Sequence, residues 1–163
     1  MQELDTRADR LRFRRTHLPE LTEIAELEVE RRRVDDEARD ARIAVDDLAV
    51  EQRKADADVE AVRVRQRRDQ ERLDSGSVGP KDLERIQAEL VSLARRVSSL
   101  EDTELEVMER QEEAQARLAG AQERLEAVEH RLADLAAARA AALAEIDAEL
   151  VSLEAERGPV AEQ

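Results

Sequence analysis

The sequence predicts an all-α fold, a long antiparallel coiled-coil helical hairpin with a short, kinked N-terminal helix. Composition, the placement of helix breakers and the spacing of apolar residues all favour it. Of the 163 residues, 42% are charged and 1% are aromatic. The apolar residues are nearly all Ala, Leu and Val, which suit a narrow helix–helix interface better than a compact core. Cysteine is absent, so neither a disulfide nor a cysteine-ligated metal falls within these residues.

The helix breakers divide the chain at three places: Leu18-Pro19, the run from Ser75 to Pro80, and Gly158-Pro159. Proline is tolerated in the first turn of a helix, so Pro19 and Pro80 are expected to begin helices. Gly76 and Gly158 are expected to close the preceding helices in the left-handed conformation. One hairpin domain is therefore predicted over residues 1–163, with helices at about 1–17, 19–74 and 80–157 and a turn at 75–79.

Apolar residues of the second long helix recur in alternating steps of three and four from Leu83 to Leu135. The first long helix keeps the same spacing, more weakly, from Leu73 back to Val34. Such spacing is the heptad signature of a coiled coil. Near the N-terminus, Leu4, Leu11 and Leu18 step by sevens in a different phase, so a kink or phase change is expected near Pro19.

Folding the chain back at the turn pairs the two apolar series in order, with partner numbers that sum to 155 or 156. The predicted neighbours are Leu73 with Leu83, Val62 with Leu93, Val59 with Val97, and Leu48 with Val107. The same alignment sets Gln52 against Glu104 and Val45 against Gln111. These polar positions either fix the register or reach water from a thin two-helix interface.

Motifs for catalysis or metal binding are missing from the sequence. It contains no glycine-rich phosphate loop, and a long hairpin offers no place for Ser, His and Asp side chains to converge. We therefore predict a non-enzymatic protein with no cofactor in these residues. No apolar run approaches the ~18–20 residues that cross a bilayer, and the N-terminus lacks the apolar region of a signal peptide. A cytoplasmic location is expected.

Basic residues gather beside the predicted turn, although the net charge of the chain is −14. The candidate partner-binding residues are Arg65, Arg67, Arg68, Arg72, Lys81 and Arg85. One interpretation is a solvated helix face whose cations pair with nearby acids such as Asp69 and Asp82. Our hypothesis is that this end of the hairpin docks an acidic surface, more readily on a protein than on nucleic acid.

Two segments beside the turn resemble a bacterial family: SVGPKDLERIQAEL at 77–90 and LEDTELEVMER at 100–110. QELDTR at 2–7 and THLPE at 16–20 look like its opening helix and proline kink. Members of that family have a coiled-coil hairpin followed by a C-terminal four-cysteine zinc ribbon, and the resemblance covers about residues 1–135. It implies that the ribbon and its zinc lie beyond Gln163, with no zinc ligand in this chain.

Two functional classes follow from the residues and the resemblance. The first is a scaffold or adaptor that presents a binding module and docks protein partners, in transcription or secretion as the resemblance implies. The alternative is a nucleic-acid-binding regulator that acts through the zinc ribbon, which a steeply salt-dependent gel shift would favour. The net charge of −14 favours the scaffold. Weak self-association is also expected, since the alanine-rich segment 133–148 can admit a further helix closely.

Overall fold

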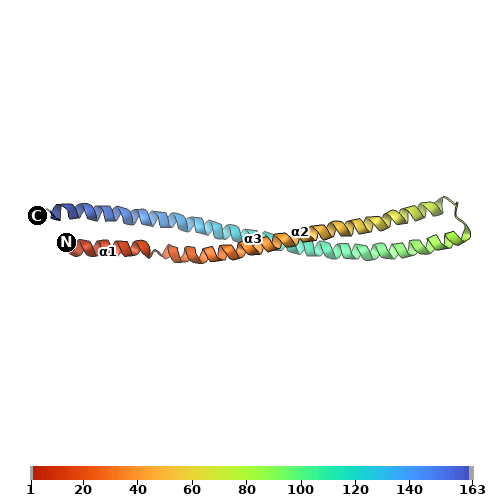
Figure 1. The fold of residues 1–163 in the computed structure, drawn as a ribbon, viewed down its shortest axis with the longest axis horizontal. Helices are drawn as coiled ribbons and strands as arrows, with labels where there is room; N and C mark the ends of the chain where they lie inside the picture. Colours follow the sequence, from red (N-terminus) through yellow and green to blue (C-terminus); the bar gives the residue numbers. More distant parts are fainter. Residues whose placement is uncertain (1, 162–163) are drawn as a thin grey trace. The chain divides into compact units, whose positions relative to one another are not determined.

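The computed structural model describes residues 2–161 of the chain and the side chains of residues 2–158. Three helices make up the fold: α1 (Gln2–Thr16), α2 (Pro19–Asp74) and α3 (Pro80–Ala161), of 15, 56 and 82 residues (Figure 1). No strand occurs within residues 2–161. The predicted all-α helical hairpin is therefore confirmed.

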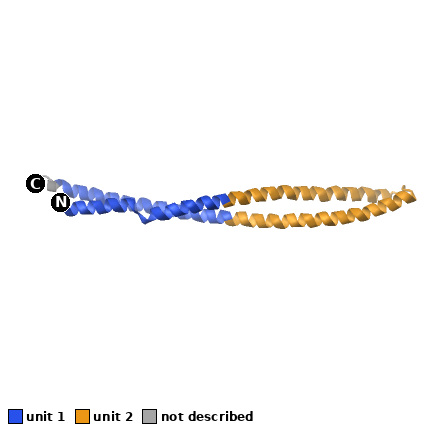
Figure 2. Ribbon diagram, turned by 60° about the horizontal axis from the view of Figure 1, so that its bottom comes forward, with its two compact units in different colours: residues 1–36, 121–163 blue, residues 37–120 orange. Residues whose placement is uncertain are grey.

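The chain divides into two compact units, each described here by itself (Figure 2). Unit 1 comprises residues 1–36 and 121–163, and unit 2 comprises residues 37–120. In unit 2, α2 and α3 lie side by side and antiparallel, joined by the turn at 75–79. In unit 1, α1 and the start of α2 lie along the C-terminal part of α3, where Arg15 pairs with Asp147 and Arg131 with Glu23.

The boundary between α1 and α2 lies at His17 and Leu18, as the phase change in the sequence predicts. The backbone N–H of His17 still donates to the Arg14 carbonyl, after which Pro19 begins the next helix. Leu18 is buried although it stands outside both helices. Its burial anchors the break, because this leucine continues the apolar series of α1 into the core of unit 1.

The two glycines that were expected to close helices behave differently. Gly76 has a φ of 66° and follows the end of α2, where its N–H donates to the Leu73 carbonyl. That prediction is confirmed. Gly158 does not have a positive φ, and α3 continues through it to Ala161, so the predicted end at 157 is wrong. Glycine permits the left-handed conformation without imposing it, and only at Gly76 must the chain reverse.

The buried apolar residues between Val34 and Leu135 fall on the predicted heptad positions, and Ile146 and Leu153 lie beyond the predicted series. In unit 2 they are Leu48, Ala55, Val59, Ile86, Val107 and Ala114, and in unit 1 they include Val34, Ala121, Leu135, Ile146 and Leu153. Alanine and valine supply many of these positions, so the core of each unit is a narrow interface between helices. Leu83, the first position of the predicted series in α3, is instead 39% exposed, whereas Ile86 is 1% exposed.

Ion pairs between α2 and α3 define the register of unit 2. In two antiparallel helices, residues at the same level have residue numbers with a constant sum. Long side chains can form an ion pair with a residue above or below their own level, so the sum for one ion pair can be larger or smaller than this constant. Arg65 pairs with Glu89 and Arg63 with Glu101, giving sums of 154 and 164. The midpoint is 159, and the sum for Arg110 and Glu51 is 161. Leu73 is therefore level with Ile86, which agrees with the exposure of Leu83.

These sums and the exposure of Leu83 favour a register displaced by one core position, roughly 5 Å along the helix axis, from the predicted sums of 155 or 156. In this register Val62 would be level with Val97 in place of Leu93, and the other predicted pairs would shift in the same way. The cause is a degeneracy of the heptad pattern. Sliding one helix by three or four residues exchanges the a and d positions but keeps every apolar residue in the interface. Apolar spacing alone therefore cannot choose between the two registers, whereas charges beside the interface can.

Two of the predicted polar positions, Gln52 and Glu104, share a hydrogen-bonded cluster with Asp56 in unit 2. Gln52 donates from Nε2 to Oδ1 of Asp56 at 2.8 Å. A hydrogen bond to Asp56 also raises the pKa of Glu104, and desolvation and the negative charge of Asp56 raise it further. Gln52 and Glu104 are both half-buried, and Asp56 links them across the two helices.

This cluster predicts a pH dependence of stability. The raised pKa of Glu104 favours folding below the unfolded pKa, near 4.5, and this contribution is lost as the pH rises through the folded pKa. At neutral pH, Glu104→Gln should therefore raise the melting temperature by removing the repulsion from Asp56. The gain should vanish on acidification to about pH 4. Thermal melts of Glu104→Gln and of Glu106→Gln, an exposed control on α3, check this; equal gains for both would contradict it.

Candidate protein-docking site

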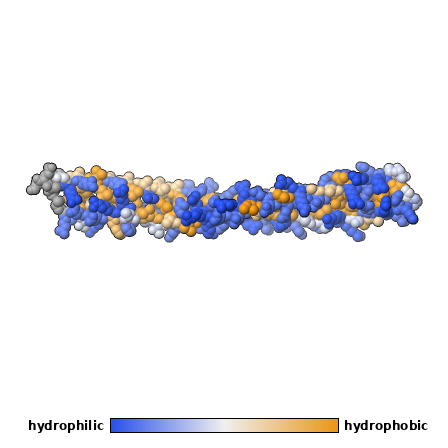
Figure 3. All heavy atoms as spheres, in the orientation of Figure 1, coloured by the Kyte–Doolittle hydropathy of each residue, from blue (hydrophilic) through white to orange (hydrophobic). Residues whose placement is uncertain are grey.

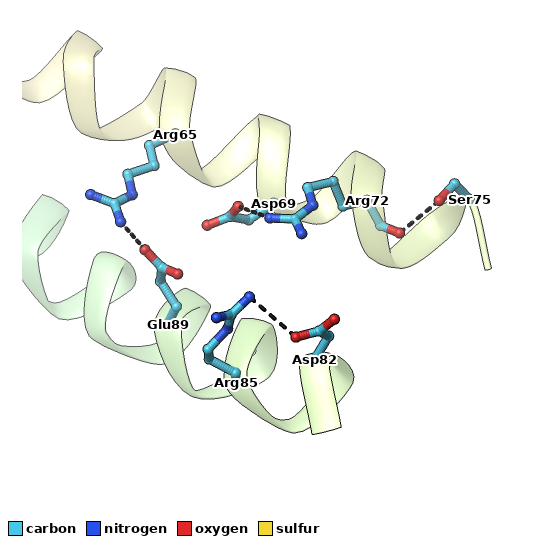
Figure 4. Close-up of polar contacts among 7 residues, drawn as sticks. All are labelled: Arg65, Asp69, Arg72, Ser75, Asp82, Arg85 and Glu89. Atoms are coloured by element: carbon cyan, nitrogen blue, oxygen red, sulfur yellow. Dashed lines mark hydrogen bonds and ion pairs between the residues drawn. The ribbon is translucent and has the colours of Figure 1, made fainter. Parts of the chain in front are cut away.

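The candidate residues lie on both sides of the turn, and most of them have acidic partners (Figure 4). Arg65 pairs with Glu89 across the hairpin, and Arg72 stands 3.8 Å from Asp69 on its own helix. The other ion pairs join Arg67 to Glu60 at 2.7 Å and Arg85 to Asp82 at 3.2 Å. Within the described residues, Arg68 and Lys81 make no ion pair. Local pairing therefore neutralises much of the predicted basic zone, as the solvated-face interpretation anticipates.

Three of the six candidates line one groove beside the turn. The groove has a volume of about 390 Å³ and is lined by Ala61, Val64, Arg65, Arg68, Asp69, Arg72 and Glu89. We call it the tip groove. Its arginines lie at steps of three and four along α2, which places them on one face of the helix. Lys81, Arg85 and Arg67 do not line it.

Asp69 occupies a core position at the floor of the tip groove. It is 5% exposed and is the one buried charged residue within the described chain. Its Oδ1 faces Arg72, whereas its Oδ2 is buried with no hydrogen-bond partner. In Figure 4 the carboxyl lies between the side chains of Arg65 and Arg72. A buried polar atom without a hydrogen-bond partner destabilises the fold, so stability does not explain why an aspartate occupies this core position.

Asp69 falls on the heptad spacing that runs from Leu73 back to Val34, but it was interpreted from the sequence only as an acid that neutralises nearby arginines. The available signal was a carboxylate at a d position one turn from the helix end, where Leu is the ordinary choice. Charge counting does not register that signal, because it treats every acid near an arginine as exposed. The floor of the groove was therefore missed, although its arginine rim was found.

A model of the CT398-like coiled coil hairpin domain matches residues 1–163 of the chain. The chain belongs to this family. The match to a coiled coil hairpin agrees with the antiparallel helices of both units. It also extends beyond the residues to which the sequence resemblance was assigned.

Several mycobacterial proteins are similar to this CT398-like hairpin. A protein of Mycobacterium tuberculosis strain H37Rv, described as uncharacterized, is 41% identical over 150 residues, which are 90% of this chain and 60% of that protein. A Mycobacterium leprae protein with the same description is 34% identical, over 72% of this chain and 51% of its own length. A solved structure from Mycobacterium smegmatis has a TM-score of 0.80 at 32% identity and covers 98% of this chain and 66% of that one. The chain thus spans about 60% of the length of its tuberculosis relative.

Unit 1 of the CT398-like hairpin carries a second groove, which is mainly apolar. It measures about 560 Å³ and is lined by Ile24, Glu28, Leu132, Ala133, Ala136, Arg139, Ala140 and Leu143. Figure 3 shows apolar surface gathered over this part of α3. The groove includes part of the alanine-rich segment from which we predict weak self-association, which stays a prediction.

The residues that the structure describes contain neither a candidate metal site nor a candidate membrane span. No group of three or more His, Asp or Glu side chains there could hold a metal ion. The zinc that the sequence resemblance implies belongs to a ribbon outside these residues, so its presence stays a prediction. No helix within the same residues is long and apolar enough to cross a membrane.

Proposed function

We propose that this CT398-like hairpin is a non-enzymatic scaffold that docks an acidic surface of a protein partner in the tip groove. The observation that supports the proposal most directly is the row of three arginines along one wall of a groove. Arg65, Arg68 and Arg72 stand close enough on α2 to repel one another, and an acidic ligand would relieve that repulsion. Arg68 lies between the other two and has no acidic partner within the described residues.

The electrostatic setting favours a protein partner over nucleic acid. The chain carries a net charge of −14, which opposes a long run of phosphates along its surface. The tip groove also contains the carboxyl groups of Asp69 and Glu89. These would repel a phosphate group, but they can accept hydrogen bonds from the N–H groups of a polypeptide.

The alternative function is nucleic-acid binding through a C-terminal zinc ribbon in a longer polypeptide. It rests on the sequence resemblance and on relatives that are longer than this chain. Its zinc ligands would have to lie outside the described residues, since those residues fit no metal site. The scaffold proposal does not depend on a ribbon.

Charge reversal at the tip tests the scaffold proposal. A variant in which Arg65, Arg67, Arg68 and Arg72 are replaced by Glu should bind a fluorescein-labelled, glutamate-rich peptide at least about tenfold more weakly than the natural chain. Fluorescence anisotropy measures the affinity, and circular dichroism should show unchanged helicity. Arg67 lies outside the groove, so restoring it alone should recover little binding.

The matched control reverses four exposed arginines of unit 2 away from the turn: Arg42, Arg53, Arg95 and Arg96. Both variants have the same net charge. A loss of peptide binding in the tip variant alone would therefore show that the position of the arginines matters, and not the total charge. Equal losses in the two variants would overturn the proposal. Binding of a single-stranded oligonucleotide that is stronger than peptide binding, and that is lost in the tip variant, would favour the nucleic-acid alternative.

A further inference from the structure

The tip groove offers two different kinds of hydrogen-bonding group side by side. Its rim presents guanidinium donors from Arg65, Arg68 and Arg72. Its floor is formed by Asp69, whose buried Oδ2 is an acceptor with no partner. A ligand that satisfies the whole groove must therefore bring an acid for the rim and an N–H or O–H donor for the floor.

Oδ2 of Asp69 has essentially no exposed surface, so a donor can reach it only after a covering side chain moves. Arg72 is the candidate for that movement. Its guanidinium stands 3.8 Å from Asp69, longer than a good charge-assisted hydrogen bond, and its side chain is 51% exposed. A carboxylate on the ligand would draw Arg72 outward and open the floor of the groove.

We propose that the tip groove binds the N-terminal turn of a partner helix that carries acidic residues there. Such a turn presents both kinds of group that the groove requires. The first N–H groups of a helix have no partner within the helix, and Asp or Glu is favoured beside them. The acidic side chains meet Arg68 and Arg72, and a free backbone N–H donates to Asp69. This inference rests on the proposed function and specifies its ligand.

Other ligand classes satisfy only half of the groove. A phosphodiester backbone brings negative charge but no donor, which leaves Asp69 unpartnered and adds repulsion from Glu89. A basic peptide supplies donors for Asp69 but meets three arginines on the rim. An acidic segment within a helix has its N–H groups already bonded in the helix. Of these four ligand classes, an acidic N-terminal turn is the one that pairs with both the rim and the floor.

Two synthetic helical peptides of the same composition provide the probes. One carries a Ser-Asp-Glu-Glu turn at its helix N-terminus, and the other carries the same acids in mid-helix. Titrated into the whole natural chain and followed by fluorescence anisotropy, the capped peptide should bind about tenfold more tightly than the mid-helix peptide. Equal affinities, or no binding of the capped peptide, would overturn the inference.

Substitution of Asp69 separates the role of the floor from that of the rim. Asp69→Leu places an apolar residue at a core position, so the chain should melt at a higher temperature while it loses the tenfold preference for the capped peptide. Asp69→Asn keeps one acceptor oxygen and should retain part of the preference. If Asp69 were merely structural, its replacement by Leu would change the melting temperature alone and leave the preference intact.

The two proposals fail in different ways. If Asp69→Leu keeps the preference while reversal of the tip arginines abolishes binding, the scaffold proposal stands and the helix-terminus inference is wrong. If reversal of the arginines leaves peptide binding unchanged, both are wrong. An oligonucleotide that competes with the capped peptide at equal charge concentration would also contradict the inference, because phosphates offer no donor to Asp69.

Discussion

Ile86→Ala should destabilise unit 2 by about 2–3 kcal/mol, at the lower end of the cost of truncating a buried isoleucine. Ile86 is 1% exposed and lies in the first complete core layer after the turn. A two-helix interface has no third element to close around the cavity that the substitution leaves. The cavity can open to water, which limits the loss of stability. Urea unfolding followed by circular dichroism at 222 nm measures the change.

Val91→Ala is the matched control on the same helix. Val91 is 54% exposed, and alanine has the higher helix propensity, so its substitution should change the free energy of unfolding by no more than about 0.5 kcal/mol. Similar costs at Val91 and Ile86 would mean that α3 does not bury one face against α2, and the hairpin would then be wrong.

A cysteine pair at positions 62 and 97 should form a disulfide within one chain rapidly and almost completely. The mean of the ion-pair sums in unit 2 favours Val62 level with Val97, and core positions are where two helices of a coiled coil approach most closely. The chain has no natural cysteine, so the introduced pair reports without interference. Non-reducing electrophoresis distinguishes an intrachain disulfide from a cross-linked dimer.

The comparison variant carries cysteines at 62 and 93, the pair that apolar spacing alone favours. It should oxidise more slowly, since position 93 lies roughly 6 Å from the level of position 62 along the axis. Faster oxidation of this pair would restore the register with sums of 155 or 156. Disulfides only between chains would show that α2 and α3 pair between molecules.

Much of the fold could be predicted from the sequence because its determinants are local. Proline at 19 and 80 begins α2 and α3, and the alternation of three- and four-residue steps marks the buried face of both long helices. The register could not be predicted in the same way, because two alignments bury the same apolar residues. It depends on which cross-helix partners Arg63 and Arg65 select, a property of the packed pair.

The candidate site, like the fold, could be predicted from the sequence only in part. The cluster of arginines near the turn is visible in the sequence, but their partners are not. Charge counting does not reveal that Arg65 reaches Glu89 or that Arg67 turns back to Glu60. The isolation of Oδ2 on Asp69 depends on the burial of a single atom. A heptad pattern assigns a residue to the core without showing whether its polar atoms find partners there.

The position at which an acidic ligand contacts the natural chain is the most direct test of the docking proposal. A glutamate-rich peptide bearing a benzophenone group can be photo-crosslinked to the unmodified protein and the attachment sites located by mass spectrometry. We expect the sites to concentrate in the lining of the tip groove, at Ala61, Val64 and Arg68. Sites concentrated along residues 121–150 of α3, with none beside the turn, would contradict it.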